Sequence, residues 1–157
     1  TIDPTVIPYI MKLKGLDADQ IEDLLNRKSG LLGISGISND ARNVCEGAEQ
    51  GNPRAILAIK MLANSIKKYI GSYIAEMNGI DALVFTAGIG ENDSDLRSTV
   101  CGNMDVFGIA IDEEKNKSIP RGTGADITLE GSKVKTLVIP TNEEYMIALD
   151  TVKYCNL

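Results

Sequence analysis

Three short segments combine glycine, carboxylate and guanidinium groups in patterns typical of sites that bind phosphorylated ligands: Ser38-Asn-Asp-Ala-Arg42, Thr86-Ala-Gly-Ile-Gly-Glu-Asn92 and Thr141-Asn-Glu-Glu144. The middle segment carries the clearest pattern. It follows Ala82-Leu-Val-Phe85, an apolar run that predicts a strand buried on both faces, as in a parallel sheet. Gly88 and Gly90 allow a tight turn with exposed backbone N–H groups. Strand, glycine turn and the start of the next helix together predict a cradle for phosphate.

The middle segment also has a plain structural interpretation. Strand-to-helix turns with one or two glycines are common in α/β proteins and need bind nothing. The two familiar nucleotide motifs do not fit either, because a dinucleotide fingerprint needs Gly or Ala where Asp93 stands, and no GK[ST] follows to form a P-loop. A nucleotide bound here would therefore be held by a different scheme. Asp93 or Ser94 can cap the helix expected next, which carries Leu96 and Val100.

The first segment lies in a stretch without a regular period. Glycine and serine alternate with isoleucine over residues 31–43, so we expect a loop, then a helix capped within residues 38–40 that runs to about Glu49. Arg42 falls in the first helical turn, where a cation opposes the helix dipole. This mismatch favours a mobile binding loop that brings Asp40 and Arg42 to a ligand. The alternative is an ordinary glycine-rich linker with an Asx cap.

The third segment follows a predicted strand at residues 134–139 and begins a predicted C-terminal helix, residues 142–157. Thr141 and Glu144 have the spacing of a capping box, which explains Glu144 structurally. Glu143 has no such explanation. It stands at the C-terminal end of a strand, where α/β sheets bind ligands. A carboxylate there can hold Mg²⁺ directly or through water.

Composition excludes several classes of function. The chain has 157 residues and a formal net charge of −6, with neither a basic stripe nor an aromatic cluster, so we expect no nucleic-acid partner. The apolar runs are too short to span a bilayer and no signal peptide is visible, so we expect no membrane association. Three cysteines without CxxC spacing, and no histidine, leave zinc without its usual ligands. Free thiols in a reducing cytoplasm are expected.

The elements around the three segments are expected to be mainly helical. Residues 3–28 predict two helices, and residues 52–78 predict one long helix with a broad apolar stripe, capped by Asn52 and ended by Gly79. That helix suits a core or a contact with a second subunit. Residues 106–139 predict a β region with strands at 109–111, 127–129 and 134–139 and a loop at 115–125. The chain also starts at Thr1 without an initiator Met, so we expect a piece of a longer protein.

Three motifs resemble one family in order and spacing: Gly36-Ile-Ser-Asn-Asp-Ala-Arg42, Phe85-Thr-Ala-Gly-Ile-Gly-Glu-Asn92 and Val138-Ile-Pro-Thr-Asn-Glu-Glu144. They are similar to the C-terminal portion of acetate kinases, over essentially the whole chain. Propionate kinases share the motifs, so the motifs do not separate the two acyl groups. The resemblance implies an α/β domain of the actin-like, acetate and sugar kinase superfamily (ribonuclease H-like), here incomplete and without its N-terminal strands.

The resemblance also implies a reaction: reversible, Mg²⁺-dependent transfer of the γ-phosphoryl group of ATP to acetate, giving acetyl phosphate and ADP. Arg42 would stabilise the transition state, and Glu143 would help to place Mg²⁺. Ala41 departs from the family, which usually has a larger apolar residue there. The nucleotide would be contacted by Asp40, Ala41 and Arg42, and by an adenosine- and phosphate-binding turn of Gly88, Ile89, Gly90, Glu91 and Asn92.

By the same resemblance, further catalytic groups (an Asn, an Arg, a His and an Asp) and another phosphate loop lie in an N-terminal half. Residues 1–157 would then be the C-terminal nucleotide-binding domain of a two-domain cytoplasmic kinase, inactive alone and normally a homodimer. The missing strands would leave residues 82–85 with an exposed edge. Two other classes stay open. One is a non-catalytic, actin-like nucleotide-binding module, which would not explain the presence of Arg42. The other is a dimerisation domain that would associate through the helix predicted at residues 52–78.

Overall fold

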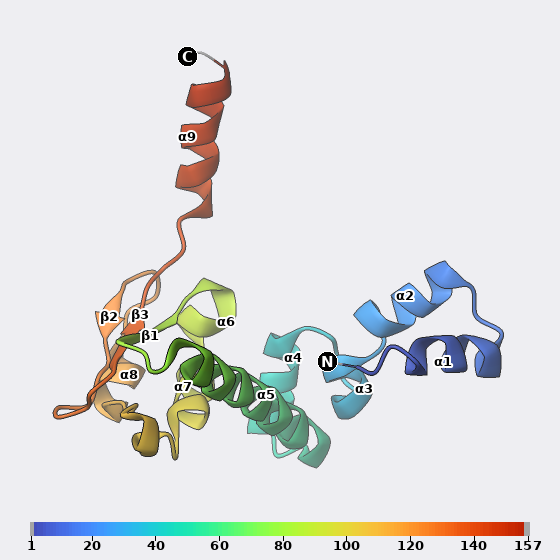
Figure 1. The fold of residues 1–157 in the computed structure, drawn as a ribbon, viewed down its shortest axis with the longest axis horizontal. Helices are drawn as coiled ribbons and strands as arrows, with labels where there is room; N and C mark the ends of the chain where they lie inside the picture. The colour runs from blue at the N-terminus through green and yellow to red at the C-terminus, as the bar shows by residue number, and fades with distance from the viewer. Residues whose placement is uncertain (1, 156–157) are drawn as a thin grey trace. The chain divides into compact units, whose positions relative to one another are not determined.

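The chain divides into two compact units, the first ending at residue 65 and the second beginning at residue 66. The computed structural model describes residues 2–155 (Figure 1). Helix α5 (Pro53–Met77) is the predicted long helix, and its two ends belong to different units. Asn52 caps it, as predicted, because its side-chain oxygen accepts from the N–H groups of Arg54 and Ala55 at 3.0 and 3.2 Å. Each unit has a small hydrophobic core of its own.

The first unit is helical: α1 (Val6–Lys14), α2 (Ala18–Arg27), α3 (Gly30–Ser35), α4 (Ala41–Glu49) and the start of α5. The two helices predicted within residues 3–28 are confirmed. Asp17 caps α2 in a capping box with Gln20. The loop predicted from residue 31 up to the helix cap at residues 38–40 was wrong at its start, where α3 forms. Its Leu31 and Ile34 pack on the core of this unit, and that burial stabilises a helix whose sequence lacks a helical period.

The second unit contains a three-stranded sheet of β1 (Ala82–Phe85), β2 (Ala125–Asp126) and β3 (Lys135–Val138), in the order β1-β3-β2. Strand β1 runs parallel to β3, and β2 runs antiparallel to it (Figure 1). Burial of β1 on both faces was predicted wrongly. Its side chains alternate between exposed and half-buried, and Val84 is 45% exposed, so one face of β1 is open to solvent among the described residues. Strand β1 is also an edge strand there. The core of this unit consists of Cys101, Met104, Ile109 and Val134.

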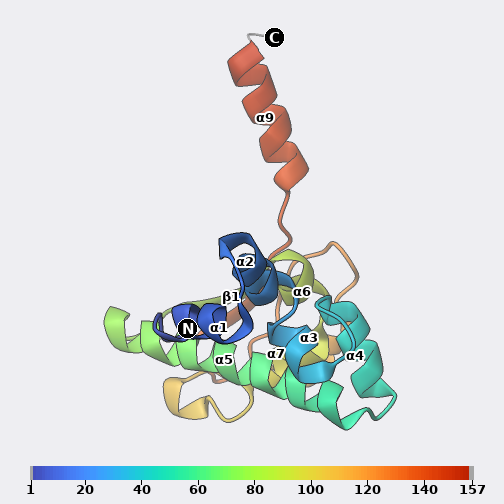
Figure 2. The ribbon, with the colours of Figure 1, turned by 90° about the vertical axis from the view of Figure 1, so that its right-hand side faces the viewer.

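The predicted β region contains more helix than expected. Helix α8 (Glu113–Ser118) occupies part of the predicted loop, and Asp112 caps it. The strand predicted at 109–111 is reduced to one bridge between Ile111 and Thr128, and that predicted at 127–129 is displaced to β2. Only the strand at 134–139 is confirmed, as β3. The remaining elements of this unit are α6 (Ala87–Asn92), α7 (Ser94–Cys101), η1 (Asp105–Phe107) and α9 (Glu143–Cys155) (Figure 2).

The predicted C-terminal helix is confirmed as α9, while residues 156 and 157 of that prediction lie outside the described residues. The predicted capping box at Thr141 was wrong. Instead, the Asn142 side-chain oxygen accepts from the Tyr145 N–H at 3.0 Å, because the Thr141 hydroxyl is turned to another partner. In residues 2–155, no helix is both long and apolar enough to cross a bilayer.

Candidate functional site

The carboxyl ends of β1 and β3 lie beside each other in the second unit. The two strands are parallel, with Phe85 opposite Val138. The Ile139 N–H donates to the Phe85 carbonyl at 2.9 Å, so the pairing continues one residue beyond β3. Each strand then leads into a helix, β1 into α6 and β3 into α9. Such an edge is where parallel sheets present ligand-binding groups.

The segment predicted as a tight glycine turn is instead the short helix α6, so the turn was predicted wrongly. The chain reverses at Ala87, whose φ of 59° is costly for a residue other than glycine. Gly90 then packs on the strand, since a Cβ there would lie 3.2 Å from the Phe85 carbonyl carbon. Gly88 differs, because a Cβ there would meet no atom of the described residues within 4 Å. Gly90 is therefore needed for packing, and Gly88 leaves backbone open to a ligand.

Glu91 joins α6 to the segment that follows β3. Its Oε1 accepts from the backbone N–H of Thr141 at 2.7 Å and from the Thr141 hydroxyl at 2.8 Å. These bonds lower the pKa of Glu91, with a smaller contribution from the backbone N–H of Ala87. The carboxylate is thus engaged within the protein. This contact brings together two of the three predicted segments, residues 88–92 and the start of α9.

Glu143, the predicted metal ligand, is the first residue of α9 and is exposed. Among the described residues, no group of three or more carboxylate, thiol or imidazole side chains could hold a metal by itself. One exposed carboxylate fits a Mg²⁺ that keeps most of its waters and binds mainly through the phosphates of a nucleotide. The role of Glu143 stays a prediction.

Asp40 and Arg42 form a local pair in the first unit. Asp40 caps α4, because its Oδ1 accepts from the Arg42 N–H at 2.9 Å, and Ala41 is the first residue of that helix. The guanidinium returns to the same carboxylate, with Nε 3.1 Å from Oδ1 and Nη2 2.5 Å from Oδ2. These bonds lower the pKa of Asp40 to about 2. Arg42 thus has a partner within its own helix cap, and its contact with a ligand stays a prediction.

The Arg42 side chain is nevertheless open to exchange, since it is 86% exposed. Water screens such a pair, and the guanidinium can leave it at little cost. Asp40 is itself placed by the Ser38 hydroxyl, which accepts from the Asp40 N–H at 3.0 Å. The first unit thus presents a guanidinium on a capped helix. Its approach to residues 88–92 and to Glu143 stays a prediction.

The buried guanidinium of Arg97 was not predicted from the sequence. Arg97 in α7 is 2% exposed, and its Nη1 donates to the carbonyl oxygens of Gly90 at 2.8 Å and Glu91 at 2.9 Å. The available signal was its place beside Leu96 on the face of α7 that also carries Cys101, and that face is buried. Periodicity could thus have predicted burial but not the acceptors that Arg97 meets.

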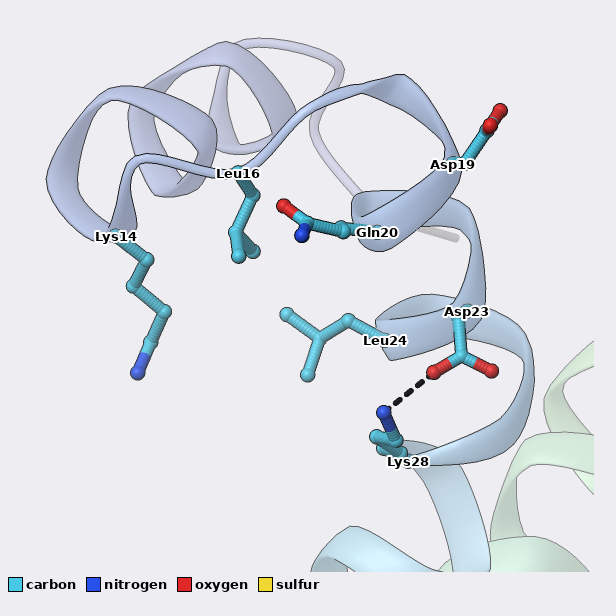
Figure 3. A pocket seen from close by; sticks show the side chains of 7 residues that line it. All are labelled: Lys14, Leu16, Asp19, Gln20, Asp23, Leu24 and Lys28. Carbon is cyan, nitrogen blue, oxygen red and sulfur yellow. Dashed lines mark ion pairs between the residues drawn. The ribbon is translucent and has the colours of Figure 1, made fainter.

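Two surface depressions do not coincide with the predicted residues. One of about 440 Å³ lies in the first unit, where Lys28 Nζ lies 2.5 Å from Asp23 Oδ2. Figure 3 shows this ion pair with Leu24 beside it. The other, of about 520 Å³, is lined by residues 105–108, 110 and 129–133 of the second unit. Neither contains a residue from the three predicted segments. Arg42 and Glu143 are themselves exposed to solvent.

Comparison with known proteins gives one consistent result. The acetokinase family profile matches residues 1–149. Acetate kinase from Methanosarcina acetivorans is 52% identical over 155 residues, which cover 99% of this chain and 38% of that protein. The crystal structure of Porphyromonas gingivalis acetate kinase matches with a TM-score of 0.88 and 46% identity, over 98% of this chain and 38% of that one. A propionate kinase from Francisella tularensis matches with a TM-score of 0.83 and 39% identity, over 94% and 37%.

These matches confirm the predicted α/β fold of the acetate kinases at the level of the whole chain. The chain spans about 38% of the length of the curated relatives it matches. Because the family profile covers nearly all of its residues, and relatives about half identical cover nearly all of it as well, the chain belongs to the acetokinase family.

Proposed function

We propose that the protein containing this chain is an acetate kinase that reversibly transfers the γ-phosphoryl group of ATP to acetate, forming acetyl phosphate and ADP. The observation that carries this proposal is the family match over residues 1–149, with 52% identity to a named acetate kinase. The chain would be the C-terminal, nucleotide-binding part. The remaining catalytic groups would come from an N-terminal half.

Arg42 is proposed to stabilise the transition state. Phosphoryl transfer depends on in-line positioning and on neutralising the equatorial oxygens. The guanidinium fork already engages the Asp40 carboxylate through two of its nitrogens. A phosphate presents oxygens that the same fork can bind bidentately. In this proposal the phosphoryl group replaces Asp40 as the partner of Arg42, while Asp40 keeps its bond to the Arg42 N–H.

Helix α6 is proposed to contact the nucleoside rather than the phosphates. The Glu91 carboxylate is held near the backbone N–H of Ala87, at the start of α6. Its negative charge there disfavours a phosphate at the same place. Gly88, by contrast, leaves room for a ring or a sugar to approach the backbone. Gly88, Ile89 and Asn92 are exposed and are the residues of α6 best placed for such a contact.

Glu143 is proposed to hold Mg²⁺ through one direct or water-mediated contact. When bound, Mg²⁺ would neutralise charge on the β- and γ-phosphate oxygens. The Thr141–Glu91 bonds anchor the chain two residues before Glu143, which supports a defined start of α9 at this place. A shift of that anchor would change Mg²⁺-ATP binding without altering Glu143 itself.

The test is a nucleotide titration of the full-length protein, with and without acetate and with Mg²⁺ present. Acetyl phosphate formation supports the kinase. Nucleotide binding without turnover points to a non-catalytic module. If the protein shows neither turnover nor nucleotide binding, both the kinase and the non-catalytic module are refuted. A dimer with neither property would leave only the dimerisation class.

Propionate kinase activity is the second candidate, because the propionate kinase from Francisella tularensis matches 94% of this chain at 39% identity. The ratio of kcat/KM for acetate and propionate decides between the two substrates. A higher value for propionate would replace acetate in the proposal and leave the nucleotide site unchanged.

A homodimer in the cytoplasm completes the proposal. Helix α5 exposes apolar side chains at intervals of four or eight residues, which supports a contact with a second copy: Leu57, Met61, Tyr69, Tyr73 and Met77. Sedimentation equilibrium on the full-length protein measures the oligomeric state. A monomer across the micromolar range would contradict the dimer.

A further inference from the structure

One buried guanidinium holds the end of α6. The last carbonyl groups of a helix have no partner within it and must find one elsewhere. In α6 the Ile89 carbonyl accepts from the Asp93 N–H, and Arg97 Nη1 serves the next two carbonyls, those of Gly90 and Glu91. A helix of six residues has little stability of its own. The position of α6 therefore depends on Arg97.

Arg97 is in turn held by Asn116 of α8. Its Nε donates to Asn116 Oδ1 at 2.7 Å, and its Nη2 donates to the Asn116 carbonyl at 3.0 Å. Asn116 is 1% exposed, and its Nδ2 donates to the Ser94 carbonyl and the Ser98 hydroxyl, both at 2.9 Å. The network links α6, α7 and α8, and each of these buried polar atoms has a hydrogen-bond partner within it. Such a network specifies one arrangement of its members.

The network is costly for a cation. The direct hydrogen bonds of Arg97 go to neutral oxygens, and burial lowers its pKa, which the nearby Asp93 carboxylate partly offsets. An apolar side chain would avoid the cost of burying a charge, but it would leave the carbonyls of Gly90, Glu91 and Asn116 without this donor. A buried cation whose hydrogen bonds go to backbone and amide oxygens of two other helices therefore suggests a requirement for placement.

Glu91 shows what is being placed. Its backbone carbonyl accepts from Arg97, and its carboxylate accepts from Thr141. One residue is thus fixed at both ends, by Arg97 inside the protein and by the segment before Glu143. A displacement of Arg97 would move Glu91, and through it both α6 and the start of α9.

We propose that Arg97 is a positioning residue for nucleotide binding, which sets α6 in place through the Gly90 and Glu91 carbonyls and is itself oriented by Asn116. This inference rests on the proposed function, because it takes α6 to contact the nucleotide. Arg97 touches neither substrate. Misplacement of a binding element by about 1 Å can cost roughly a hundredfold in activity.

Arg97→Lys in the full-length protein tests the proposal. Lysine keeps the charge but has a single nitrogen, which cannot serve acceptors on both α6 and α8 in the way the planar fork does. We expect KM for ATP and Kd for ADP to rise about 10- to 100-fold. KM for acetate should change less than twofold. Hydrogen exchange should show faster exchange of the residue 87–92 amides.

The control is Val134→Ala, which removes core packing in the same unit. Val134 packs with Cys101, Met104 and Ile109 and does not belong to the network. The melting temperature of the Val134→Ala variant should fall, while its KM for ATP should stay within twofold of the wild-type value. An equal rise in KM for ATP in Val134→Ala would overturn the proposal, since instability alone would then explain it. So would an unchanged KM in Arg97→Lys.

Asn116→Ala covers the case in which Arg97→Lys does not fold. It keeps the bonds from Arg97 to α6 and removes only the side chain that orients Arg97. A smaller rise in KM for ATP is expected, and no rise in either variant overturns the proposal. If the wild type binds ADP but forms no acetyl phosphate, the kinase proposal fails, and the Kd ratio of wild type to Arg97→Lys still decides the role of Arg97.

Discussion

Two six-residue helices, α3 in the first unit and α6 in the second, end against an arginine from a later helix. At α3, Arg54 donates from Nε to the Ile34 carbonyl at 2.7 Å and from Nη2 to the Gly33 carbonyl at 3.1 Å. At α6, Arg97 donates to the carbonyls of Gly90 and Glu91 at nearly the same distances. The local pattern is the same in both units, and each helix lies at or just before a candidate ligand segment.

The two arginines differ in their access to water. Arg54 is exposed, whereas Arg97 is 2% exposed. Water can replace Arg54 at its acceptors, but it cannot reach those of Arg97 without opening the unit. Burial, and not the hydrogen-bond pattern, therefore decides how much stability the protein loses when each arginine is removed.

The largest effect is expected at Arg42, the exposed cation that follows α3. Arg42→Ala in the full-length protein should lower kcat by about 10²–10⁵, because the transition state loses a bidentate cation. The melting temperature should hardly change, since the side chain is 86% exposed. Steady-state acetyl phosphate formation measures the effect, with Arg42→Lys as the matched control. A near-normal kcat in Arg42→Ala would remove Arg42 from the mechanism.

The next largest effect is expected when each of the two arginines, Arg97 and Arg54, is replaced by methionine. Arg97→Met should lower the free energy of unfolding by about 3 kcal/mol, because several buried carbonyl and amide oxygens lose their donor. Arg54→Met should lower it by less than about 1 kcal/mol, because water replaces the guanidinium. Urea unfolding of the two variants gives both values. Equal losses would show that burial does not separate the two sites.

Acid should weaken the two units through different carboxylates. The folded-state pKa of Asp40 is lowered from 3.8 to about 2 and that of Glu91 is lowered from 4.5, so each stabilises the protein above its ordinary pKa. That stabilisation is lost as pH falls through the folded-state value. Glu91→Gln should therefore flatten the loss of stability below pH 4.5, and Asp40→Asn should flatten it mainly between pH 3.8 and about 2.

Added salt should affect the Asp40–Arg42 and Glu91–Thr141 contacts to different extents. The Asp40–Arg42 pair is ionic and should weaken as salt is added, whereas the Glu91 carboxylate bonds neutral groups of Thr141 and should respond less. Urea unfolding at two salt concentrations and at pH 5 measures the difference. An equal salt response in Glu91→Gln and Asp40→Asn would contradict the assignment of the contacts.

The smallest effect concerns a buried polar group of the second unit that, unlike Arg97, is unsatisfied. Among the described residues, the Thr136 hydroxyl has no hydrogen-bond partner although the residue is fully buried in β3. Thr136→Val should leave the free energy of unfolding unchanged or raise it by about 1 kcal/mol, because the shape is kept and an unpaired hydroxyl is removed. Thermal unfolding measures it. A clear loss of stability would mean that the hydroxyl has a partner in the full-length protein.

The elements that could be predicted are those with local causes. Asp17, Asp40, Asn52 and Asp93 each cap the helix expected from the sequence, since a cap needs only an N–H two or three residues away. The 25-residue helix α5 was recognisable because its apolar period repeats many times. Helices α3, α6 and α8 were missed because six residues give almost no periodic signal.

The candidate site follows the same division. The three motifs, and with them the family, could be read from residue types and spacing alone. The partners of those residues could not. Thr141 was assigned to a capping box with Glu144, yet it bonds Glu91, which is 50 positions away. Arg97 was not singled out, because its acceptors depend on how α6 folds back on β1.

By itself the sequence determined the family of this protein, the starts of most helices and the three segments that carry its candidate chemistry. Only the tertiary structure decided that Glu91 meets Thr141 and that Arg97 meets Asn116 and the end of α6. The physical reason is range. A cap or an apolar stripe is set by neighbours within a few residues, whereas strand register and core packing choose which distant polar groups are buried against each other.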